Sequence, residues 1–315
     1  MNERKPVVLV TGASGFVGAH VATALAKEQW TVRRAVRSPK GLDNEFLIGS
    51  IGIETDWQAA LMGVDAVVHL AAHVHHKHEE HAVELYRNIN IAGTLRLARS
   101  AAMAGVRQFI FVSTVLVHGR SSEGRAPFSE DDFLTPRGLY GMSKAAAEAG
   151  LRSLARNAEM KISVIRPPMV YGAGAKGSFA LLTRAVNLGL PLPLAAIRNQ
   201  RAFLAVQNLS SFILWRLIHP DPTSNFEIFL VADRELVSTP DFVERLARAS
   251  GKNPRLFRMP PELLSSLLSI VGRRDMHESL IGSLKLDVSK AMATGWQPEV
   301  SLDEGLRLAL SAHDT

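Results

Sequence analysis

The first half of the chain alternates short apolar runs with segments of helical spacing. Runs rich in Val, Ile and Leu predict buried strands, near residues 6–10, 31–37, 65–72, 108–113 and 161–166. Residues 20–29 and 87–104 have apolar positions at helical spacing, and a further helix follows Tyr140. Strands that alternate with helices predict an α/β fold, a Rossmann-type doubly wound parallel sheet.

The pattern is less regular beyond residue 170, where glycine- and proline-rich breaks separate several helical stretches. We therefore expect a dinucleotide-binding domain over residues 1–170, with a returning segment near residues 203–232. Residues 171–315 are expected to form mainly a smaller C-terminal substrate-binding lobe.

Composition narrows the function classes. The chain has no cysteine, which excludes disulfides, a thiol nucleophile and thiolate metal sites. No apolar run reaches the length of a membrane span, and the apolar segment 261–271 is expected to pack in the core. The formal charge of +6 favours anionic partners, but Lys and Arg are scattered without a basic block. We predict a cytoplasmic protein that binds a phosphate-bearing small molecule and no nucleic acid.

A glycine turn follows the first strand. Gly12, Gly15 and Gly18 lie between that strand and the first helix. Glycine permits positive φ and lets the backbone approach a diphosphate at the helix N-terminus. The spacing predicts a dinucleotide site.

The end of the second strand bears on the choice of dinucleotide. A carboxylate there would bind the adenosine ribose and repel a 2′-phosphate. This chain has Arg37 instead, with Arg33 and Arg34 nearby. The pattern favours NADP(H) over NAD(H), although Arg37 could also lie over the adenine of either cofactor.

Tyr140 and Lys144 stand four residues apart on a predicted helix and can therefore reach one site. A tyrosine normally keeps its proton until pH about 10, and lowering that pKa to about 7 takes roughly 4 kcal/mol. A cation at about 4 Å supplies roughly that amount at an effective dielectric near 20. The pair is a candidate for proton transfer, although such a spacing also occurs on solvated helix surfaces.

Several further motifs occur in one order along the chain. They are T-G-x-x-G-x-x-G from Thr11, His69-Leu70-Ala71-Ala72, Asn90-Ile91-Ala92-Gly93-Thr94, Val112-Ser113-Thr114, Tyr140-x-x-x-Lys144 and Arg166-Pro167-Pro168-Met169-Val170-Tyr171-Gly172. Together they resemble the extended short-chain dehydrogenase/reductase family, which includes UDP-galactose 4-epimerase and related nucleotide-sugar enzymes. The resemblance covers almost the whole chain.

The resemblance implies roles for individual residues. Tyr140 would be the acid/base, Lys144 the partner that lowers its pKa, and Thr114 the hydroxyl that orients the substrate oxygen, with Ser113 a weaker candidate. The implied cofactor-binding residues are Gly12, Ser14, Gly15, Phe16, Val17, Gly18, Arg37, Leu70, Ala71, Ala72, Asn90, Tyr140, Lys144 and Pro167. The implied substrate-binding residues are His75, Thr114, Lys176, Ser178, Phe179 and Arg201, with Arg201 facing the nucleotide phosphate or uracil.

Residues 174–179 and 198–203 are similar to a bacterial polysaccharide subgroup of that family. The resemblance implies NAD(P)H-dependent reduction of the 4-keto group of a UDP-linked 6-deoxy-N-acetylhexosamine, for surface polysaccharide such as O-antigen. One alternative is a nucleotide-sugar 4-epimerase that retains NAD. Another is a non-catalytic dinucleotide sensor or scaffold, which would need the glycine turn but neither Tyr140 nor Lys144. The resemblance also implies a homodimer formed through the helices that follow Asn90 and Tyr140.

Five histidines crowd into nine residues, from His73 to His81. Spacing of the His-x-x-x-His kind can bind zinc. The chemistry expected here needs no metal, so we predict a loop with one or two substrate or cofactor contacts and no metal site.

Overall fold

The computed structural model describes residues 4–74, 82–270, 278 and 280–311. Contacts between Cα atoms divide the chain into two compact units, each built from separate segments. Unit 1 comprises Met1–Val117, Phe133–Pro167 and Ser210–Phe229, and unit 2 comprises His118–Asp132, Pro168–Leu209 and Leu230–Thr315.

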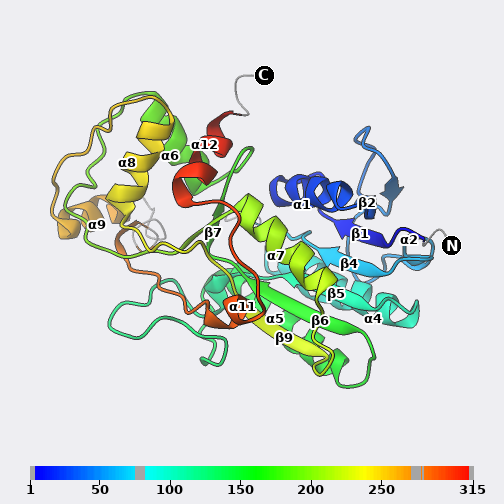
Figure 1. The fold of residues 1–315 in the computed structure, drawn as a ribbon. Helices are drawn as coiled ribbons and strands as arrows, with labels where there is room; N and C mark the ends of the chain where they lie inside the picture. The colour runs from blue at the N-terminus through cyan, green and yellow to red at the C-terminus, as the bar shows by residue number, and fades with distance from the viewer. Residues whose placement is uncertain (1–3, 75–81, 271–277, 279, 312–315) are drawn as a thin grey trace. The chain divides into compact units, whose positions relative to one another are not determined.

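Unit 1 is built on a seven-stranded sheet in the order β3-β2-β1-β4-β5-β6-β9 (Figure 1). The strands are β1 (Val7–Thr11), β2 (Thr31–Val36), β3 (Glu45–Leu47), β4 (Ala66–His69), β5 (Gln108–Val112), β6 (Lys161–Arg166) and β9 (Phe226–Leu230). The five pairings among the first six strands are parallel. The predicted α/β class and parallel sheet are confirmed.

Helices connect these strands. In unit 1 they are α1 (Phe16–Lys27), α2 (Gln58–Leu61), α3 (Ala82–Leu85), the π-helix η1 (Tyr86–Gly93), α4 (Thr94–Met103), the short 3-10 helix η2 (Val115–Val117) and α5 (Gly138–Ala155). A further helix, α7 (Val206–Ile218), begins in unit 2 and continues in unit 1. The helix predicted over 87–104 is thus π-helical in its first part. A π-turn leaves no mark in apolar spacing, and such turns are frequent at functional sites.

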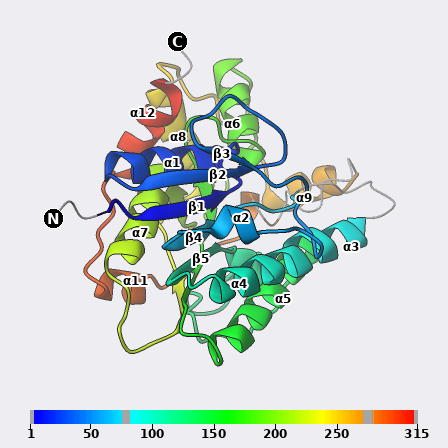
Figure 2. The ribbon, with the colours of Figure 1, turned by 90° about the vertical axis from the view of Figure 1, so that its right-hand side faces the viewer.

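One face of the sheet is covered by α4 and α5, which lie side by side (Figure 2). Leu9, Val67 and Phe109 from three strands are buried against Leu97 of α4 and Leu151 of α5. Figure 2 shows α1 on the opposite side of the strands. Burial of such side chains contributes about 1.5–3 kcal/mol each, so this packing holds the strand ends in register.

Unit 2 has a smaller two-stranded sheet and its own apolar core. Its elements are β7 (Met169–Tyr171), α6 (Ser178–Asn187), β8 (Phe203–Ala205), α8 (Thr239–Ala249), α9 (Pro261–Ile270), α11 (Ser289–Ala293) and α12 (Leu302–Ser311). Tyr171, Phe242 and Leu306 are buried together at its centre. The Tyr171 hydroxyl donates to Asp233, at 2.8 Å, so the buried carboxylate is satisfied. Leu264 of α9 joins this core, consistent with the packing expected there.

A search of the described residues found no helix that is long and apolar enough to cross a membrane.

His69 ties together three elements of unit 1. It is fully buried on β4, where Nδ1 lies 2.7 Å from Thr11 Oγ1 and Nε2 lies 2.8 Å from Thr94 Oγ1. Thr11 Oγ1 also accepts from the amides of Leu70 and Ala71, both at 3.2 Å. Its own proton is therefore directed to Nδ1, which assigns the Nε2–H tautomer of a neutral imidazole.

Burial lowers the pKa of His69 to about 3, and nearby Lys144 adds to this effect. An imidazole that stays neutral in the folded state contributes stability above the unfolded pKa of about 6.5, and that stability is lost as pH falls towards 3. We expect the free energy of unfolding to fall by up to about 1.4 kcal/mol per pH unit across this window from this group. Urea titrations at a series of pH values measure it.

Two variants isolate the contribution of His69. His69→Gln should lose this pH dependence, whereas His219→Gln, at an exposed position on unit 1, should keep the wild-type slope. Equal slopes in all three proteins would contradict the buried neutral imidazole.

Candidate active site

The predicted cofactor and catalytic residues of unit 1 lie at the carboxyl ends of its parallel strands. The glycine turn follows β1, Arg37 follows β2, Leu70 follows β4, Thr114 follows β5 and Pro167 follows β6. In open parallel sheets this edge is where ligands bind. The fold therefore brings together residues that are up to 155 positions apart, from Gly12 to Pro167.

The glycine turn is sterically closed to side chains. A Cβ on Gly18 would lie 2.1 Å from the Gly12 carbonyl oxygen, and a Cβ on Gly12 would lie 2.8 Å from the Ala71 amide. Gly12 also has a positive φ of 71°. Glycine is therefore required for α1 to start this close to β1 and to the segment after β4.

The same turn fits a dinucleotide phosphate. Gly15 is the N-cap of α1 and provides no side-chain cap for the first turn. The amides of that turn, together with the positive end of the helix dipole, form an anion site. Ser14 is exposed beside it, while Phe16 and Val17 are half-buried.

Asn90 holds the segment after β4. Its Oδ1 accepts from the His73 amide at 2.7 Å, and its Nδ2 donates to the His73 carbonyl at 3.1 Å. Nδ2 also donates to Ser143 Oγ at 3.0 Å, and Ser143 donates to the Tyr140 carbonyl at 2.8 Å. Asn90, predicted only as a cofactor contact, thus connects the segment after β4 to the helix that carries Tyr140.

The two hydroxyls after β5 have different surroundings. Ser113 donates a short hydrogen bond to Glu148 and is 3% exposed. Thr114 Oγ1 accepts from the Leu116 amide at 3.3 Å, which leaves its proton available to an acceptor. Thr114 is therefore the better placed of the two to orient a substrate oxygen.

Tyr140 and Lys144 lie on the first turns of α5. A Cβ on Gly141 would lie 3.0 Å from the Leu116 carbonyl oxygen, so glycine lets α5 approach the segment that carries Thr114. Lys144 Nζ donates to the Val112 carbonyl at 2.8 Å and lies 4.3 Å from the centre of the Phe111 ring. It lies 5.9 Å from the centre of the Tyr140 ring.

The pKa directions differ from the one expected from the sequence. Burial lowers the pKa of Lys144 to about 7, against the opposing charge of Glu148. Burial, with a contribution from Tyr86, raises the pKa of Tyr140 instead of lowering it. A spacing-based argument counts the attraction of the lysine but omits the cost of moving a phenolate out of water. At neutral pH Tyr140 is a phenol that can donate its proton.

A buried ion pair supports this region. Arg166 Nη2 donates to Glu148 Oε2 at 2.6 Å, and its Nε lies 3.2 Å from both carboxylate oxygens. The two side chains are 2% and 4% exposed. Since Ser113 also donates to Glu148, the pair joins the ends of β5 and β6 to α5.

The three arginines at the second strand are used differently. Arg33 donates to the carbonyls of Ala60, at 2.6 Å, and Met62, at 3.0 Å, while Arg34 donates to the Asp43 carbonyl at 2.6 Å. Arg37 is exposed directly after β2. Only Arg37 is placed to meet a group at the strand end.

The predicted substrate residues of unit 2 differ in exposure. Lys176 and Ser178 are exposed at the start of α6. Phe179 is 4% exposed and its ring packs 5.9 Å from that of Tyr171 and 6.3 Å from that of Phe242. The ring packs in the core of unit 2, and its predicted contact with a sugar nucleotide stays a prediction.

Arg201 is a buried cation in unit 2. It is 7% exposed and donates to the carbonyls of Gly282, at 2.5 Å, and Glu278, at 3.2 Å. Within the described part of the chain it forms no ion pair with a carboxylate, and burial lowers its pKa to about 10. Among the described residues, its charge is balanced by carbonyl dipoles.

His75, predicted to contact substrate, lies outside the described residues, as do His76, His78 and His81. The described part of the chain contains no group of three or more His, Cys, Asp or Glu that could hold a metal ion.

Comparison with known proteins decides the family. Residues 8–232 match the model of the NAD dependent epimerase/dehydratase family. This chain belongs to that family. Its relatives include epimerases and reductases of nucleotide sugars, which supports an NAD(P)-dependent oxidoreductase activity for this chain.

Individual relatives align along almost their full length. UDP-glucose 4-epimerase of Vibrio cholerae is 36% identical over 97% of this chain and 94% of its own. GDP-6-deoxy-D-mannose reductase of Pseudomonas aeruginosa is 26% identical over 96% of both chains. The structure of RMD from Pseudomonas aeruginosa complexed with NADPH matches with a TM-score of 0.72 at 23% identity, over 98% of both chains. The family therefore includes both epimerases and reductases.

The sequence does not show which residues hold this site in place through hydrogen bonds and ion pairs. Asn90, Ser113 and Arg166 occur in the motifs, but the motifs do not show which residues each of them contacts. Glu148 had one available signal, its position one turn after Lys144 on the same helix.

The buried pair gives a stability prediction. Removing one partner leaves an uncompensated buried charge, so Glu148→Gln and Arg166→Met should each lower the free energy of unfolding by about 3–5 kcal/mol. The double variant should lose less than the sum by at least about 2 kcal/mol. Urea unfolding of the four proteins measures this coupling.

Asp241→Asn is the matched control, because it removes a carboxylate that pairs with Arg245 at 3.2 Å near the surface. It should cost less than about 1 kcal/mol. Additive losses at Glu148 and Arg166 would contradict the buried coupling.

Proposed function

We propose that this protein reduces the 4-keto group of a UDP-linked 6-deoxy-N-acetylhexosamine, in the synthesis of bacterial surface polysaccharide. The observation that carries the proposal is the half-buried Tyr140 phenol, whose ring centre lies 5.9 Å from Lys144 Nζ at the edge of the sheet that also holds the glycine turn. Reduction of a ketone requires a proton donor at the forming alkoxide. A phenol with a raised pKa is protonated at neutral pH and meets that requirement.

Three residues of unit 1 have different roles in the proposed reaction. A bound reduced nicotinamide would supply the hydride. The Thr114 hydroxyl donates to the carbonyl oxygen and fixes its orientation, and Tyr140 then transfers its proton to that oxygen. The ammonium of Lys144 stabilises the phenolate that remains.

Arg201 supports the assignment of a nucleotide diphosphate. A buried cation that donates to carbonyls gains a stronger partner when an anion binds, because a charge-assisted hydrogen bond replaces part of its lost hydration. We propose that Arg201 contacts the diphosphate or the uracil of the substrate, with Lys176 and Ser178 as further contacts.

A 4-epimerase that retains NAD is the second candidate, favoured by the 36% identity to UDP-glucose 4-epimerase of Vibrio cholerae. The two reactions differ in their use of cofactor. A reductase consumes one reduced cofactor per product, whereas an epimerase recycles it. We also propose a homodimer formed through η1, α4 and α5, as the resemblance implies.

Incubation with a panel of UDP-4-keto sugars and both reduced cofactors tests the function. We expect stoichiometric loss of NADPH absorbance, with the product configuration at C4 determined by NMR. Tyr140→Phe should lower kcat by about 10²–10⁴-fold, since it removes the proton donor, with little change in NADPH binding. Interconversion of UDP-hexoses without loss of reduced cofactor would identify the epimerase instead. Unchanged turnover in Tyr140→Phe would contradict both.

Cofactor choice gives a separate prediction. Arg37 is exposed at the end of β2, where a 2′-phosphate would lie, and a charge-assisted contact contributes about 1.5–3 kcal/mol. Arg37→Ala should weaken NADPH binding by about 10- to 100-fold and leave NADH binding within about two-fold. Fluorescence titration with each cofactor measures this. Arg99→Ala, at an exposed position on α4, is the control for net charge, and equal loss for both cofactors would contradict the assignment.

A further inference from the structure

The outer surface of α6 combines exposed leucines with cations. Leu181, Arg184 and Leu188 are spaced at i, i+3 and i+7, so they lie along one stripe of the helix. Leu181 is 51% exposed and Leu188 is 63% exposed. Leu190, just beyond the helix, is 49% exposed. The side chains of this stripe do not pack into the core of unit 2.

The segment 251–260 extends this surface. Leu256 pairs with Leu192, and the Arg255 guanidinium donates to the Gly189 carbonyl at 3.3 Å. Phe257 is 43% exposed, and Lys252 and Arg258 are exposed as well. We name the α6 face as the exposed side chains of residues 181–190 together with those of residues 251–258.

Carboxylates are missing from the sequence segments that build the α6 face. Residues 181–190 and 251–258 contain four Lys and Arg and no Asp or Glu. The chain has 36 Lys and Arg in total, so 32 remain elsewhere against 30 Asp and Glu. The two segments thus carry four of the six net positive charges of the chain. They are 60 residues apart in the sequence, which is why no basic block is visible there.

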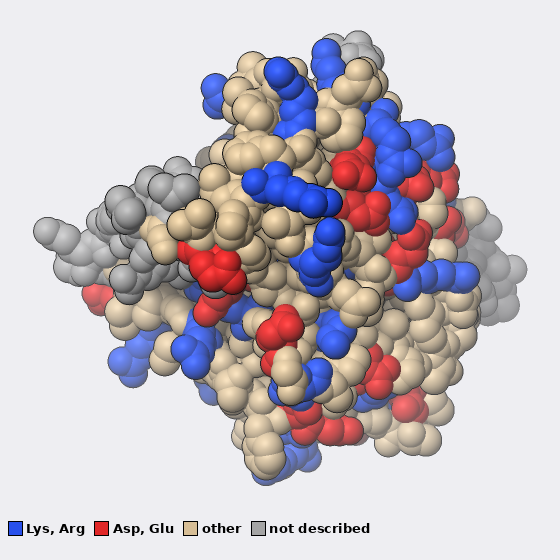
Figure 3. All heavy atoms as spheres, turned by 90° about the vertical axis from the view of Figure 1, so that its left-hand side faces the viewer, with Lys and Arg blue, Asp and Glu red and all other residues tan. Residues whose placement is uncertain are grey.

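The cations of the α6 face are not neutralised within the described residues, because neither Arg184 nor Arg255 forms an ion pair there. Three carboxylates of unit 2 gather instead around Arg245, namely Glu235 at 3.0 Å, Asp241 at 3.2 Å and Asp303 at 3.6 Å. Figure 3 shows Lys and Arg among uncharged side chains in the uppermost part of the face it views.

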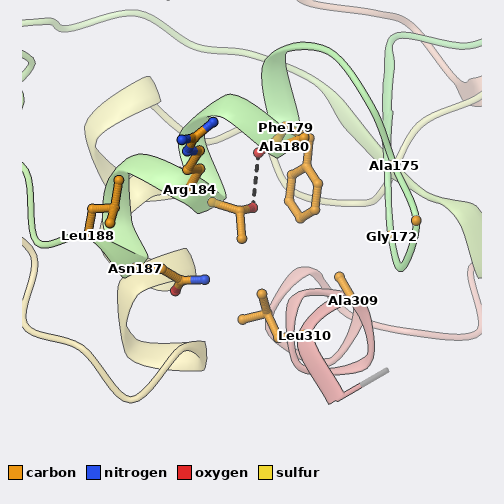
Figure 4. A pocket seen from close by; sticks show the side chains of 11 residues that line it. Gly172, Ala175, Phe179, Ala180, Arg184, Asn187, Leu188, Ala309 and Leu310 are labelled. Carbon is orange, nitrogen blue, oxygen red and sulfur yellow. Dashed lines mark hydrogen bonds between the residues drawn. The ribbon is translucent and has the colours of Figure 1, made fainter. Parts of the chain in front are cut away.

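An apolar groove of about 420 Å³ opens between α6 and α12. Figure 4 shows Phe179 of α6 and Leu310 of α12 facing each other across it, with Leu188 at one end and Arg184 on the helix above. The loop at Gly172 and Gly174 lines the other end. The groove shares Arg184 and Leu188 with the α6 face, so apolar space and positive charge adjoin.

We propose that the α6 face docks on an anionic phospholipid surface, with the groove between α6 and α12 accepting part of an acyl chain. Peripheral binding of this kind needs apolar side chains that enter the interface and cations that attract the headgroups. Both are present on one face, together with a groove for a hydrocarbon chain. A nucleic acid would pair with the cations but would leave the leucines and the groove in water.

Co-sedimentation with vesicles tests the proposal. The full-length protein should bind vesicles of phosphatidylcholine mixed with phosphatidylglycerol and should not bind pure phosphatidylcholine. Binding should weaken as salt rises from about 0.1 M to about 1 M, because the Debye length falls from about 10 Å to about 3 Å. Arg184→Glu and Arg255→Glu should each lower the partition coefficient at least about five-fold. Leu188→Asp should lower it by a similar factor or more.

Two controls lie on unit 1 outside η1, α4 and α5: Lys27→Glu changes charge equally, and Met62→Asp changes an apolar side chain that is 72% exposed. Both should retain wild-type vesicle binding, and thermal unfolding should show that all variants fold. Equal binding to both vesicle types, or equal loss in the unit 1 controls, would overturn the proposal. So would the finding that the wild type ignores vesicles while Leu188→Asp dissociates a dimer, because the face would then join two copies of the chain.

Discussion

The site depends on the buried contact between Glu148 and Arg166. It joins the ends of β5 and β6 to α5, and Ser113 ties the residue before Thr114 to the same carboxylate. Thr114, Tyr140 and Lys144 lie on elements that are otherwise joined by apolar packing and by the hydrogen bond from Lys144 Nζ to the Val112 carbonyl. Apolar packing sets their distance but tolerates small slides, whereas a bidentate ion pair has a fixed geometry. Burying two charges has a desolvation cost, and this buried pair lies next to the residues whose positions matter most for the reaction.

The same burial governs the chemistry. Burial lowers the pKa of Lys144 and raises that of Tyr140. Both shifts disfavour the charged forms, the ammonium and the phenolate, in the folded protein. The phenol therefore keeps its proton until a charge develops beside it. Glu148 acts against the shift at Lys144 and keeps the ammonium accessible near neutral pH. Desolvation and the nearby charges thus keep Tyr140 protonated and lower the pKa of the neighbouring ammonium.

The features that could be predicted from the sequence are those that a local pattern of residues encodes. The strands, the glycine turn and the Tyr140–Lys144 spacing each follow from residues that are close in the chain. The sequence alone could not identify contacts made by folding, such as Asn90 with Ser143, 53 residues away. The sequence also does not distinguish Arg33 and Arg34, which donate to carbonyls, from Arg37, which stays exposed, because the three side chains are chemically identical. Nor could the sequence show that Phe179, predicted to contact a ligand, also packs in the core of unit 2.

The distribution of charge is another property that depends on which segments folding brings together. The net charge of +6 looks diffuse in the sequence, yet the four cations of residues 181–190 and 251–258 are on segments joined by the pairing of Leu192 with Leu256. A pI near 9.8 says only that the chain prefers anions. The structure divides that preference in two. Arg201 is buried among carbonyls and suits a single small anion, whereas Arg184 and Arg255 stand beside exposed leucines and suit an extended anionic surface. In the two proposals, exposure and the neighbouring side chains thus determine which partner an arginine suits.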